Sequence, residues 1–206
     1  MEKNRKKALV IYGSPRENGN TDILLKELVK GIKDGNKKIE VEEIYLRTLN
    51  IHPCRECRSC DNSGRCVVND DMQKLYEKLQ YADYIILGSP IFFYSVTAQT
   101  KAMIDRSQAL WAKKYLLKQK KTKEKRGWFI STGATRGKKL FEGASFTIRY
   151  FFDALDAIYT GELLIKGIDE KGDILNYPEA LCQAYELGRE IAKTTLTKRF
   201  KKCNLN

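Results

Sequence analysis

The chain contains very little histidine and proline, and it lacks any long apolar run. Only one histidine, His52, and four prolines occur among its 206 residues. A Ser-His-Asp triad would have to be built on His52, so we expect no catalytic triad and no catalytic side chain supplied by the chain itself. The apolar stretch that follows the basic residues 3–7 is too short for a signal-peptide core or a membrane span. We therefore expect a cytoplasmic protein without a membrane partner.

Two nucleotide-binding signatures are also missing. The chain has neither the G-x-G-x-x-G dinucleotide fingerprint nor a Walker loop ending in Gly-Lys-Ser/Thr. Residues 13–21 instead form the polar sequence GSPRENGNT, between an apolar run at 8–12 and an amphipathic segment at 23–32. A strand, a loop and a helix in this order point unpaired N–H groups and a positive helix end at one spot, which favours phosphate. A capped turn without a ligand explains this loop alone equally well.

Several side chains of the 13–21 loop suit a phosphate. The hydroxyls of Ser14 and Thr21 can donate to phosphate oxygens, and Arg16 adds a fixed charge with a fork of donors. Asn20 or Thr21 is expected to cap the helix that follows. Because both dinucleotide and Walker signatures are missing, the unit points to a mononucleotide phosphate site of the flavodoxin type.

The chain carries a strong excess of positive charge. Lysine and arginine number 38 against 26 acidic residues, a net charge of +12. Much of this charge lies at 113–126 and at 198–202, where we expect a solvated surface. The 113–126 segment has no stacking aromatic residue apart from Tyr115, so it lacks the platforms that single-strand nucleic-acid binders use. We therefore expect no nucleic-acid partner.

Apolar and polar segments alternate along the chain in a way that predicts an α/β fold. Strands are expected at 8–13, 38–46, 84–88, 127–131 and 157–165, with helices at 20–34, 70–80, 97–111, 140–155 and 177–196. Such alternation predicts a flavodoxin-like, doubly wound, five-stranded parallel sheet of order 2-1-3-4-5, with a cysteine-rich loop at 47–69 after strand two. With no repeat and no second domain boundary, residues 1–206 are predicted to form one domain.

In this strand order a ligand crevice lies outside the carboxyl ends of strands one and three. The loops there are 13–21 and 89–95. The second loop holds Phe92, Phe93 and Tyr94, which can flank an aromatic ring or pack in the core. A turn at 132–134 after strand four adds a third edge with backbone amides.

The motifs at 13–21, 88–98 and 101–106, together with the cysteine loop that ends at 66–72, resemble the NADPH-dependent FMN reductase superfamily. Among its members, the iron-sulfur flavoprotein branch is the most similar. The resemblance covers the first half of the chain and, beyond it, only the strand–helix order and the Ser-Thr-Gly turn. It implies an FMN cofactor and a homodimer or homotetramer with flavin sites near the subunit contacts. By position, it implies that the FMN phosphate is held by Ser14, Arg16, Asn20 and Thr21, and that the flavin is lined by Pro90, Ile91, Phe92 and Phe93, with Thr132 and Gly133 at its rim.

Four of the six cysteines lie close together, which is typical of a metal site and not of a secreted disulfide framework. Cys54, Cys57, Cys60 and Cys66 have the spacing C-x2-C-x2-C-x5-C, whose two leading steps match a bacterial ferredoxin run. We therefore expect a 4Fe–4S cluster beside the FMN crevice of the same or a neighbouring subunit. Structural zinc, with His52 replacing one cysteine, and unliganded thiols or a disulfide are the alternatives. Arg106 follows a helix face that we expect to pack a dimer, and we expect its role to be structural and not catalytic.

The sequence thus predicts an FMN-dependent redox enzyme that works in electron transfer or NAD(P)H-dependent reduction. Its donor is NAD(P)H or a ferredoxin-like protein, and its acceptor is a small molecule. Two other functions are compatible with the same residues: a plain NAD(P)H:FMN or quinone reductase without a cluster, and a zinc-stabilised basic binding module. The colour of the purified protein separates the flavoprotein from the zinc module.

Overall fold

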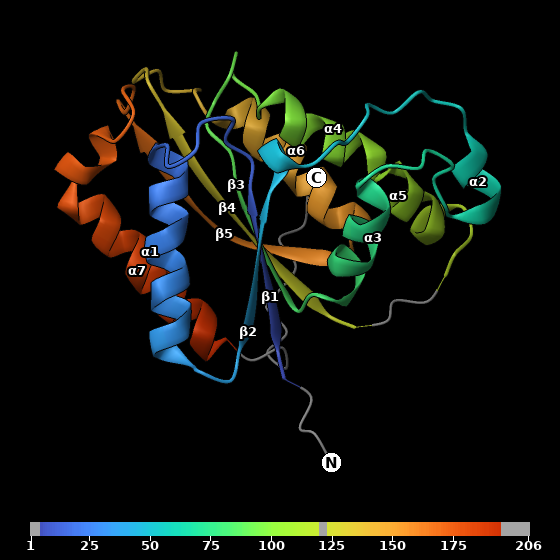
Figure 1. The fold of residues 1–206 in the computed structure, drawn as a ribbon, viewed down its shortest axis with the longest axis horizontal. Helices are drawn as coiled ribbons and strands as arrows, with labels where there is room; N and C mark the ends of the chain where they lie inside the picture. Colours follow the sequence, from blue (N-terminus) through green and yellow to red (C-terminus); the bar gives the residue numbers. More distant parts are fainter. Residues whose placement is uncertain (1–4, 120–122, 195–206) are drawn as a thin grey trace.

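The protein is built on a parallel sheet. A computed structural model describes residues 5–119 and 123–194 (Figure 1). Within these residues the strands are β1 (Lys7–Tyr12), β2 (Glu40–Tyr45), β3 (Tyr84–Gly88), β4 (Lys125–Gly133) and β5 (Ala157–Lys166), in the order β2-β1-β3-β4-β5. Every neighbouring pair is parallel. The predicted flavodoxin-like fold and strand order are confirmed.

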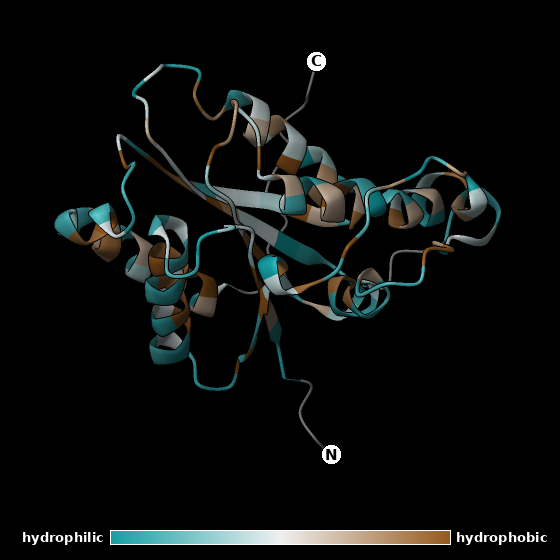
Figure 2. Cartoon of the chain, turned by 45° about the horizontal axis from the view of Figure 1, so that its top comes forward, coloured by the Kyte–Doolittle hydropathy of each residue, from teal (hydrophilic) through white to brown (hydrophobic). Residues whose placement is uncertain are grey.

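Helices cover both faces of this sheet (Figure 1). On one face lie α1 (Asn20–Gly35) and α7 (Pro178–Lys193). The other face carries α3 (Met72–Tyr81), α4 (Ala98–Arg106), α5 (Gln108–Tyr115) and α6 (Glu142–Ala154). A short helix, α2 (Ser59–Ser63), lies in the cysteine loop, and two 3-10 turns cover Leu46–Thr48 and Asp173–Asn176. Figure 2 shows that the helices turn hydrophobic residues toward the sheet.

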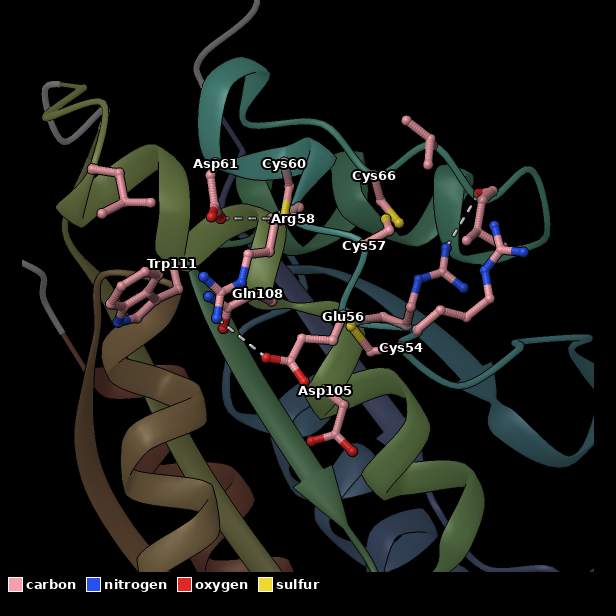
Figure 3. Close-up of a pocket in the computed structure, with 16 residues that line it drawn as sticks. Cys54, Glu56, Cys57, Arg58, Cys60, Asp61, Cys66, Asp105, Gln108 and Trp111 are labelled. Atoms are coloured by element: carbon pink, nitrogen blue, oxygen red, sulfur yellow. Dashed lines mark hydrogen bonds and ion pairs between the residues drawn. The ribbon is translucent and has the colours of Figure 1, made fainter.

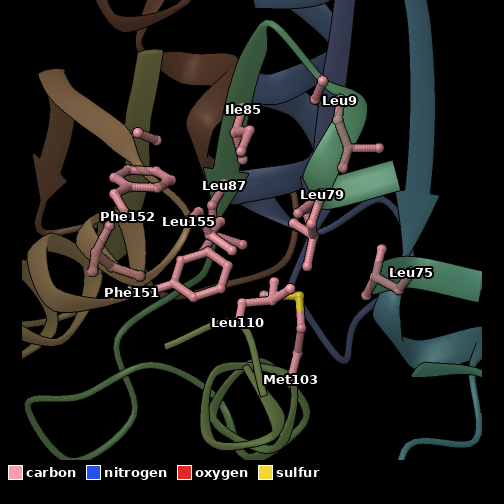
Figure 4. Packing of buried hydrophobic residues seen from close by; sticks show 14 of the residues in the cluster. Leu9, Leu75, Leu79, Ile85, Leu87, Met103, Leu110, Phe151, Phe152 and Leu155 are labelled. Atoms are coloured by element: carbon pink, nitrogen blue, oxygen red, sulfur yellow. The ribbon is translucent and has the colours of Figure 1, made fainter. Parts of the chain in front are cut away.

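The strands alternate their side chains between two apolar cores, as the pleat requires. Leu9 and Ile11 of β1 pack with α3 to α6, where Met103 and Phe151 are also buried (Figure 4). Val10 faces the opposite core, under α1 and α7. Each fully buried Leu or Ile side chain contributes about 1.5–3 kcal/mol relative to an exposed one. This burial on both faces explains why the central strands read as continuous apolar runs.

The helix expected at 97–111 is divided in the structure. α4 ends at Arg106 and α5 begins at Gln108, because the Ser107 hydroxyl donates to the Met103 carbonyl at 3.0 Å, a bond that bends helices. The strand expected at 127–131 is longer and pairs with β5 from Lys125 to Gly133. Parts of the basic segments, residues 120–122 and 198–202, and the expected end of the last helix at 196 lie outside the described residues. In the part of the chain that the structure describes, no helix is long and apolar enough to cross a membrane.

Candidate functional site

A crevice lies at the carboxyl ends of β1, β3 and β4, where the strand order predicted it. It encloses about 90 Å³. Nine of the ten residues that the resemblance assigned to the cofactor line it: Ser14, Arg16, Asn20, Thr21, Pro90, Ile91, Phe92, Thr132 and Gly133. The loop and the turn that meet here come from distant parts of the chain. Gly13 lets the 13–21 loop pack closely against the end of β3 and against α4. A Cβ at this position would lie 2.1 Å from Thr100 Oγ1 and 2.7 Å from the Gly88 carbonyl oxygen.

The start of α1 opens onto the crevice without a side-chain cap. Gly19 is the N-cap residue, and no side chain bonds the first-turn N–H groups within the described residues, so the expected cap by Asn20 or Thr21 is wrong. The Asn20 side chain is engaged elsewhere: its Nδ2 donates to the Glu170 carbonyl at 2.8 Å, and its Oδ1 accepts from the Gly172 N–H at 3.0 Å. The Thr21 hydroxyl lies 2.8 Å from the Thr132 hydroxyl. An uncapped N-terminus of a long helix favours an anionic ligand.

The 13–19 loop is folded by its own bonds. The Ser14 hydroxyl accepts from the Arg16 N–H and donates to the Arg16 carbonyl, both at 3.1 Å. Asn18 has a left-handed backbone, with φ at 53°, and its N–H donates to the buried Asp22 carboxylate at 3.1 Å. Asp22 also pairs with Arg47 at 2.9 Å. The loop is therefore shaped before any ligand enters.

An aromatic turn stands at the mouth of the crevice. Phe92 and Ser95 exchange two backbone hydrogen bonds, of 2.9 and 3.0 Å. Phe93 and Tyr94 between them are left-handed, with φ at 49° and 61°. Such a conformation costs on the order of 1–3 kcal/mol for each residue that is not glycine. Phe92 lines the crevice, whereas the side chain of Phe93 is fully exposed and is not part of the lining.

One wall of the crevice was not predicted from the sequence. Ile168, Asp169 and Lys171 follow β5 and line the crevice, and the Asp169 carbonyl accepts from Arg16 Nη1 at 3.3 Å. This wall lies next to the uncapped start of α1 and brings a second cation, Lys171, to the crevice. The signal that marks this segment in the sequence is the pair of glycines around it, since Gly167 and Gly172 both have positive φ.

The four clustered cysteines line a second pocket, of about 630 Å³ (Figure 3). Cys54 and Cys57 are exposed, and Cys60 and Cys66 are half-buried. The Ser59 hydroxyl and N–H lower the pKa of the Cys57 thiol, whereas burial raises the pKa of the Cys60 thiol. Among residues 5–119 and 123–194, no three His, Cys, Asp or Glu side chains are gathered closely enough to hold a metal ion. His52 is not part of the pocket lining.

Arg106 belongs to this second pocket and not to an outer helix face. It is 1% exposed, lines the cysteine pocket and pairs with Asp70 at 2.6 Å. The expected structural role of Arg106 is consistent with this burial, and the dimer packing expected for the helix face before it stays a prediction. Buried guanidinium groups need such paired acceptors.

The two pockets lie apart in this chain. They have no lining residue in common. Figure 1 draws α2, with the cysteine loop, at one end of the long axis and the carboxyl ends of β1 and β3 away from it.

Comparison with known proteins gives a family and several relatives. A family model described as NADPH-dependent FMN reductase matches residues 6–162. An iron-sulfur flavoprotein of Methanocaldococcus jannaschii is 41% identical over 104 residues, which are 50% of this chain and 53% of the relative. A Bacillus subtilis protein named as an NAD(P)H-dependent FMN-containing oxidoreductase is 28% identical over 182 residues, 88% of this chain and 96% of the relative. This chain spans about half the length of the iron-sulfur flavoproteins of M. jannaschii and Archaeoglobus fulgidus that it matches.

The fold has solved counterparts as well. The structure of an FMN-dependent NADH-azoreductase from Bacillus anthracis in complex with FMN has a TM-score of 0.60 at 14% identity, and the match covers 91% of this chain and 98% of that chain. At this identity the likeness concerns the fold. The family model, in contrast, covers most of the chain, including the crevice loops at 13–21 and 89–95. The chain therefore belongs to the NADPH-dependent FMN reductase family.

Proposed function

We propose that this chain binds FMN in the crevice and works as a flavin-dependent oxidoreductase that takes electrons from NAD(P)H and passes them to a small-molecule acceptor. One observation carries the proposal: the uncapped N-terminus of α1 opens onto a crevice with two cations, Arg16 and Lys171. A phosphate is the ligand that such an end favours. FMN, once bound, supplies hydride and one-electron chemistry, so no catalytic side chain is needed.

The residues of the crevice suit FMN better than a dinucleotide. One phosphate loop is present and the fingerprint for a pyrophosphate is absent. The Pro90, Ile91 and Phe92 side chains offer an apolar wall, and Thr132 and Gly133 at the end of β4 form its edge. We assign the phosphate to the 13–21 loop and the ring to the 90–92 side.

We also propose that the working form is a homodimer or homotetramer. The crevice of one chain encloses about 90 Å³. Pockets that surround a whole small molecule enclose roughly 300–1,000 Å³. A single chain therefore covers only part of a ligand of this size. Phe93 and Tyr94 stand exposed at the mouth, where a second copy of the chain would cover both them and the ligand.

For the cysteine loop we propose a 4Fe–4S cluster bound by Cys54, Cys57, Cys60 and Cys66. Three observations support it: the spacing of the cysteines, their position around one pocket, and the likeness to proteins named iron-sulfur flavoproteins. Four cysteine thiolates are the ligands that a 4Fe–4S cluster takes. The thiols would have to close around it, since they are not gathered in the structure. A cluster supplies single-electron exchange, which would suit a ferredoxin-like donor, whereas NAD(P)H would give its electron pair as hydride to the flavin.

Anaerobic purification followed by an absorbance spectrum tests this function directly. We expect a flavin spectrum that bleaches when NADPH or a reduced ferredoxin is added. The reductant that bleaches the flavin faster identifies the class of electron donor. Iron, sulfide and zinc assays on the same sample test the cluster. A colourless protein with stoichiometric zinc would contradict the whole proposal, and a flavoprotein without iron would leave a plain FMN reductase.

The cluster proposal makes a specific prediction for Cys57. Changing Cys57 to alanine removes a ligand from the cysteine pocket and touches no residue of the crevice. We therefore expect the variant to lose most of its iron and sulfide while its FMN content stays unchanged. The exposed Cys182, changed to alanine, is the matched control and is expected to keep both. Equal iron contents in the two variants would argue against these ligands.

A further inference from the structure

The cysteine loop is closed at its base by a buried ion pair. Arg106, at the end of α4, and Asp70, at the end of the loop, have side chains that are 0% and 1% exposed. Arg106 Nη1 donates to Asp70 Oδ2 at 2.6 Å and Arg106 Nη2 donates to Asp70 Oδ1 at 3.1 Å. Two parallel bonds of this kind fix the guanidinium in one orientation.

The same two side chains hold both ends of the loop. Arg106 donates to the His52 carbonyl at 2.9 Å, two residues before Cys54, and to the Val68 carbonyl at 3.2 Å, two residues after Cys66. Asp70 accepts from the His52 N–H at 3.0 Å. The chain thus enters and leaves the cysteine loop through one hydrogen-bonded frame.

Neighbouring bonds tighten this frame on the Cys66 side. Gln73 Nε2 donates to the Cys66 carbonyl at 3.0 Å and to the Val68 carbonyl at 2.6 Å. The Tyr76 hydroxyl donates to the Arg106 carbonyl at 2.6 Å, which ties α3 to the end of α4. The first and last cysteines are therefore held from the protein side, while Cys57 lies on an exposed segment between left-handed residues Glu56 and Arg58.

One N–H group of the Arg106 guanidinium has no hydrogen-bond acceptor among the described residues. Arg106 Nε is buried and has no hydrogen-bond partner among the described residues, although Arg106 lines the pocket of the four cysteines. A guanidinium is charged at any physiological pH, and Arg106 lines the pocket together with Cys66. A buried donor without a partner carries a desolvation cost that a ligand in the pocket would remove.

We infer that Arg106 and Asp70 are positioning residues for the cysteine site: they hold Cys54 and Cys66 on one pocket and present a fixed positive charge and a free N–H to whatever the four thiolates bind. The inference rests on the proposed cluster. Charge and hydrogen bonds to the sulfur atoms are two means by which proteins set cluster stability and potential. Arg106 does not touch the crevice, so it acts on the cysteine site alone.

The test compares Arg106→Gln with Arg55→Gln. Both changes remove one positive charge from the lining of the same pocket, but Arg55 is exposed and no bond of the frame involves it. The His52 and Met72 N–H groups both donate to Asp70, at 3.0 and 3.1 Å. In the reduced, metal-free protein, we expect hydrogen exchange of these two amides to rise about tenfold or more in Arg106→Gln, and to stay unchanged in Arg55→Gln. After anaerobic reconstitution, Arg106→Gln is expected to retain less iron and sulfide and to have a lower midpoint potential, at unchanged FMN content.

Loss of FMN from Arg106→Gln would reveal that this variant does not fold. In that case Arg106→Lys and Asp70→Asn take its place in the test. Lysine keeps the charge but cannot bond both ends of the loop, so we expect faster exchange with a smaller change in potential. Equal exchange and equal iron retention in the Arg106 and Arg55 variants would overturn the inference. A wild-type protein that takes up no iron would instead overturn the proposed cluster, while the exchange comparison would still decide whether the frame exists.

Discussion

Arg16 combines exposure to solvent with a position at the uncapped end of α1. Its guanidinium bonds only weakly within the chain, to the Asp169 carbonyl at 3.3 Å. It is therefore available to a phosphate, for which its fork of donors is suited. Lys171 also lines the crevice, on the segment whose Asp169 carbonyl accepts from Arg16, so the two cations would share the charge of one ligand.

Changing Arg16 to alanine is expected to weaken FMN binding by about tenfold or more, the loss expected when a charge-assisted hydrogen bond is left unmade. Titration of flavin-free protein, followed by the quenching of FMN fluorescence, measures the change. Arg149→Ala is the control, because Arg149 is an exposed arginine of α6 outside the crevice. Equal affinities for the two variants would show that the phosphate lies elsewhere.

Asp70 predicts a defined dependence of stability on pH. Burial raises the pKa of its carboxyl, but the Arg106 hydrogen bonds and the His52 and Met72 N–H groups outweigh burial and hold the pKa below its ordinary value of 3.8. A depressed pKa means that the stabilisation is fully present above the ordinary value and is lost as the pH falls through the lowered one.

We therefore expect wild type to exceed Asp70→Asn in free energy of unfolding by a constant amount above roughly pH 5, and by less near pH 3. Breaking a buried pair costs about 3–5 kcal/mol, which sets the expected size at neutral pH. Urea unfolding of both proteins at the two pH values checks this. A difference that grows as the pH falls would contradict the assigned direction.

The residues that line the crevice were predicted from the sequence where they belong to loops that directly follow strands. Ser14, Pro90 and Thr132 line it because the carboxyl ends of parallel strands meet at one edge. Lys171 was missed because its loop is held at the crevice by bonds to Asn20 and Arg16, which are contacts between segments far apart in the sequence. The buried pairing of Arg106 was hidden for the same reason, since Asp70 is distant in sequence.

Among the elements, α1 and α7 make an unusually close contact. A Cβ at Gly188 of α7 would lie 2.1 Å from the Leu28 carbonyl oxygen of α1, and one at Gly31 of α1 would lie 2.0 Å from the Tyr185 carbonyl oxygen of α7. Backbone atoms cannot yield as a flexible side chain does. The two helices therefore need glycine at these positions, and α1 in turn carries the start of the crevice.

Changing Gly188 to alanine is expected to push the helices apart and to destabilise the protein by about 1–3 kcal/mol, the usual cost of overpacking. It is also expected to weaken FMN binding, because α1 moves. Thermal unfolding and FMN titration measure the two effects. Glu186→Ala on the exposed face of α7 is the control. An unchanged melting temperature would contradict the close contact.

The boundaries of the elements were predicted less well than their order. Periodicity locates the apolar face of a helix but not the hydroxyl of Ser107, whose bond to the Met103 carbonyl divides 97–111 into two helices. The predicted cap of α1 was wrong because the Asn20 side chain bonds the 170–174 segment. Tertiary contacts of this kind override the local preference of a residue.

At the scale of the whole molecule, the crevice and the cysteine pocket share no lining residue, and the homo-oligomer remains a proposal. The exposed turn with Phe93 is the part of the crevice that a second copy would cover. Figure 1 draws the cysteine loop at the edge of the molecule, where it could reach the crevice of a neighbour. An electron path between subunits would follow from this arrangement.

Changing Phe93 to aspartate is therefore expected to shift the protein toward the monomer, because a charge would be buried at the contact between copies. Sedimentation velocity at several concentrations measures the shift. Tyr81→Asp is the control, since Tyr81 is also an exposed aromatic residue but lies on α3, outside the crevice. The same assembly in wild type and Phe93→Asp would exclude this turn from the contact.

The central claim is that the crevice holds one FMN, and the released cofactor tests it most directly. The protein is purified anaerobically and denatured, and the supernatant is separated by chromatography and weighed by mass spectrometry. We predict FMN at about one per chain, in line with a single phosphate loop without a pyrophosphate fingerprint. FAD in its place, or no flavin after the purified protein has been offered FMN, would contradict the account.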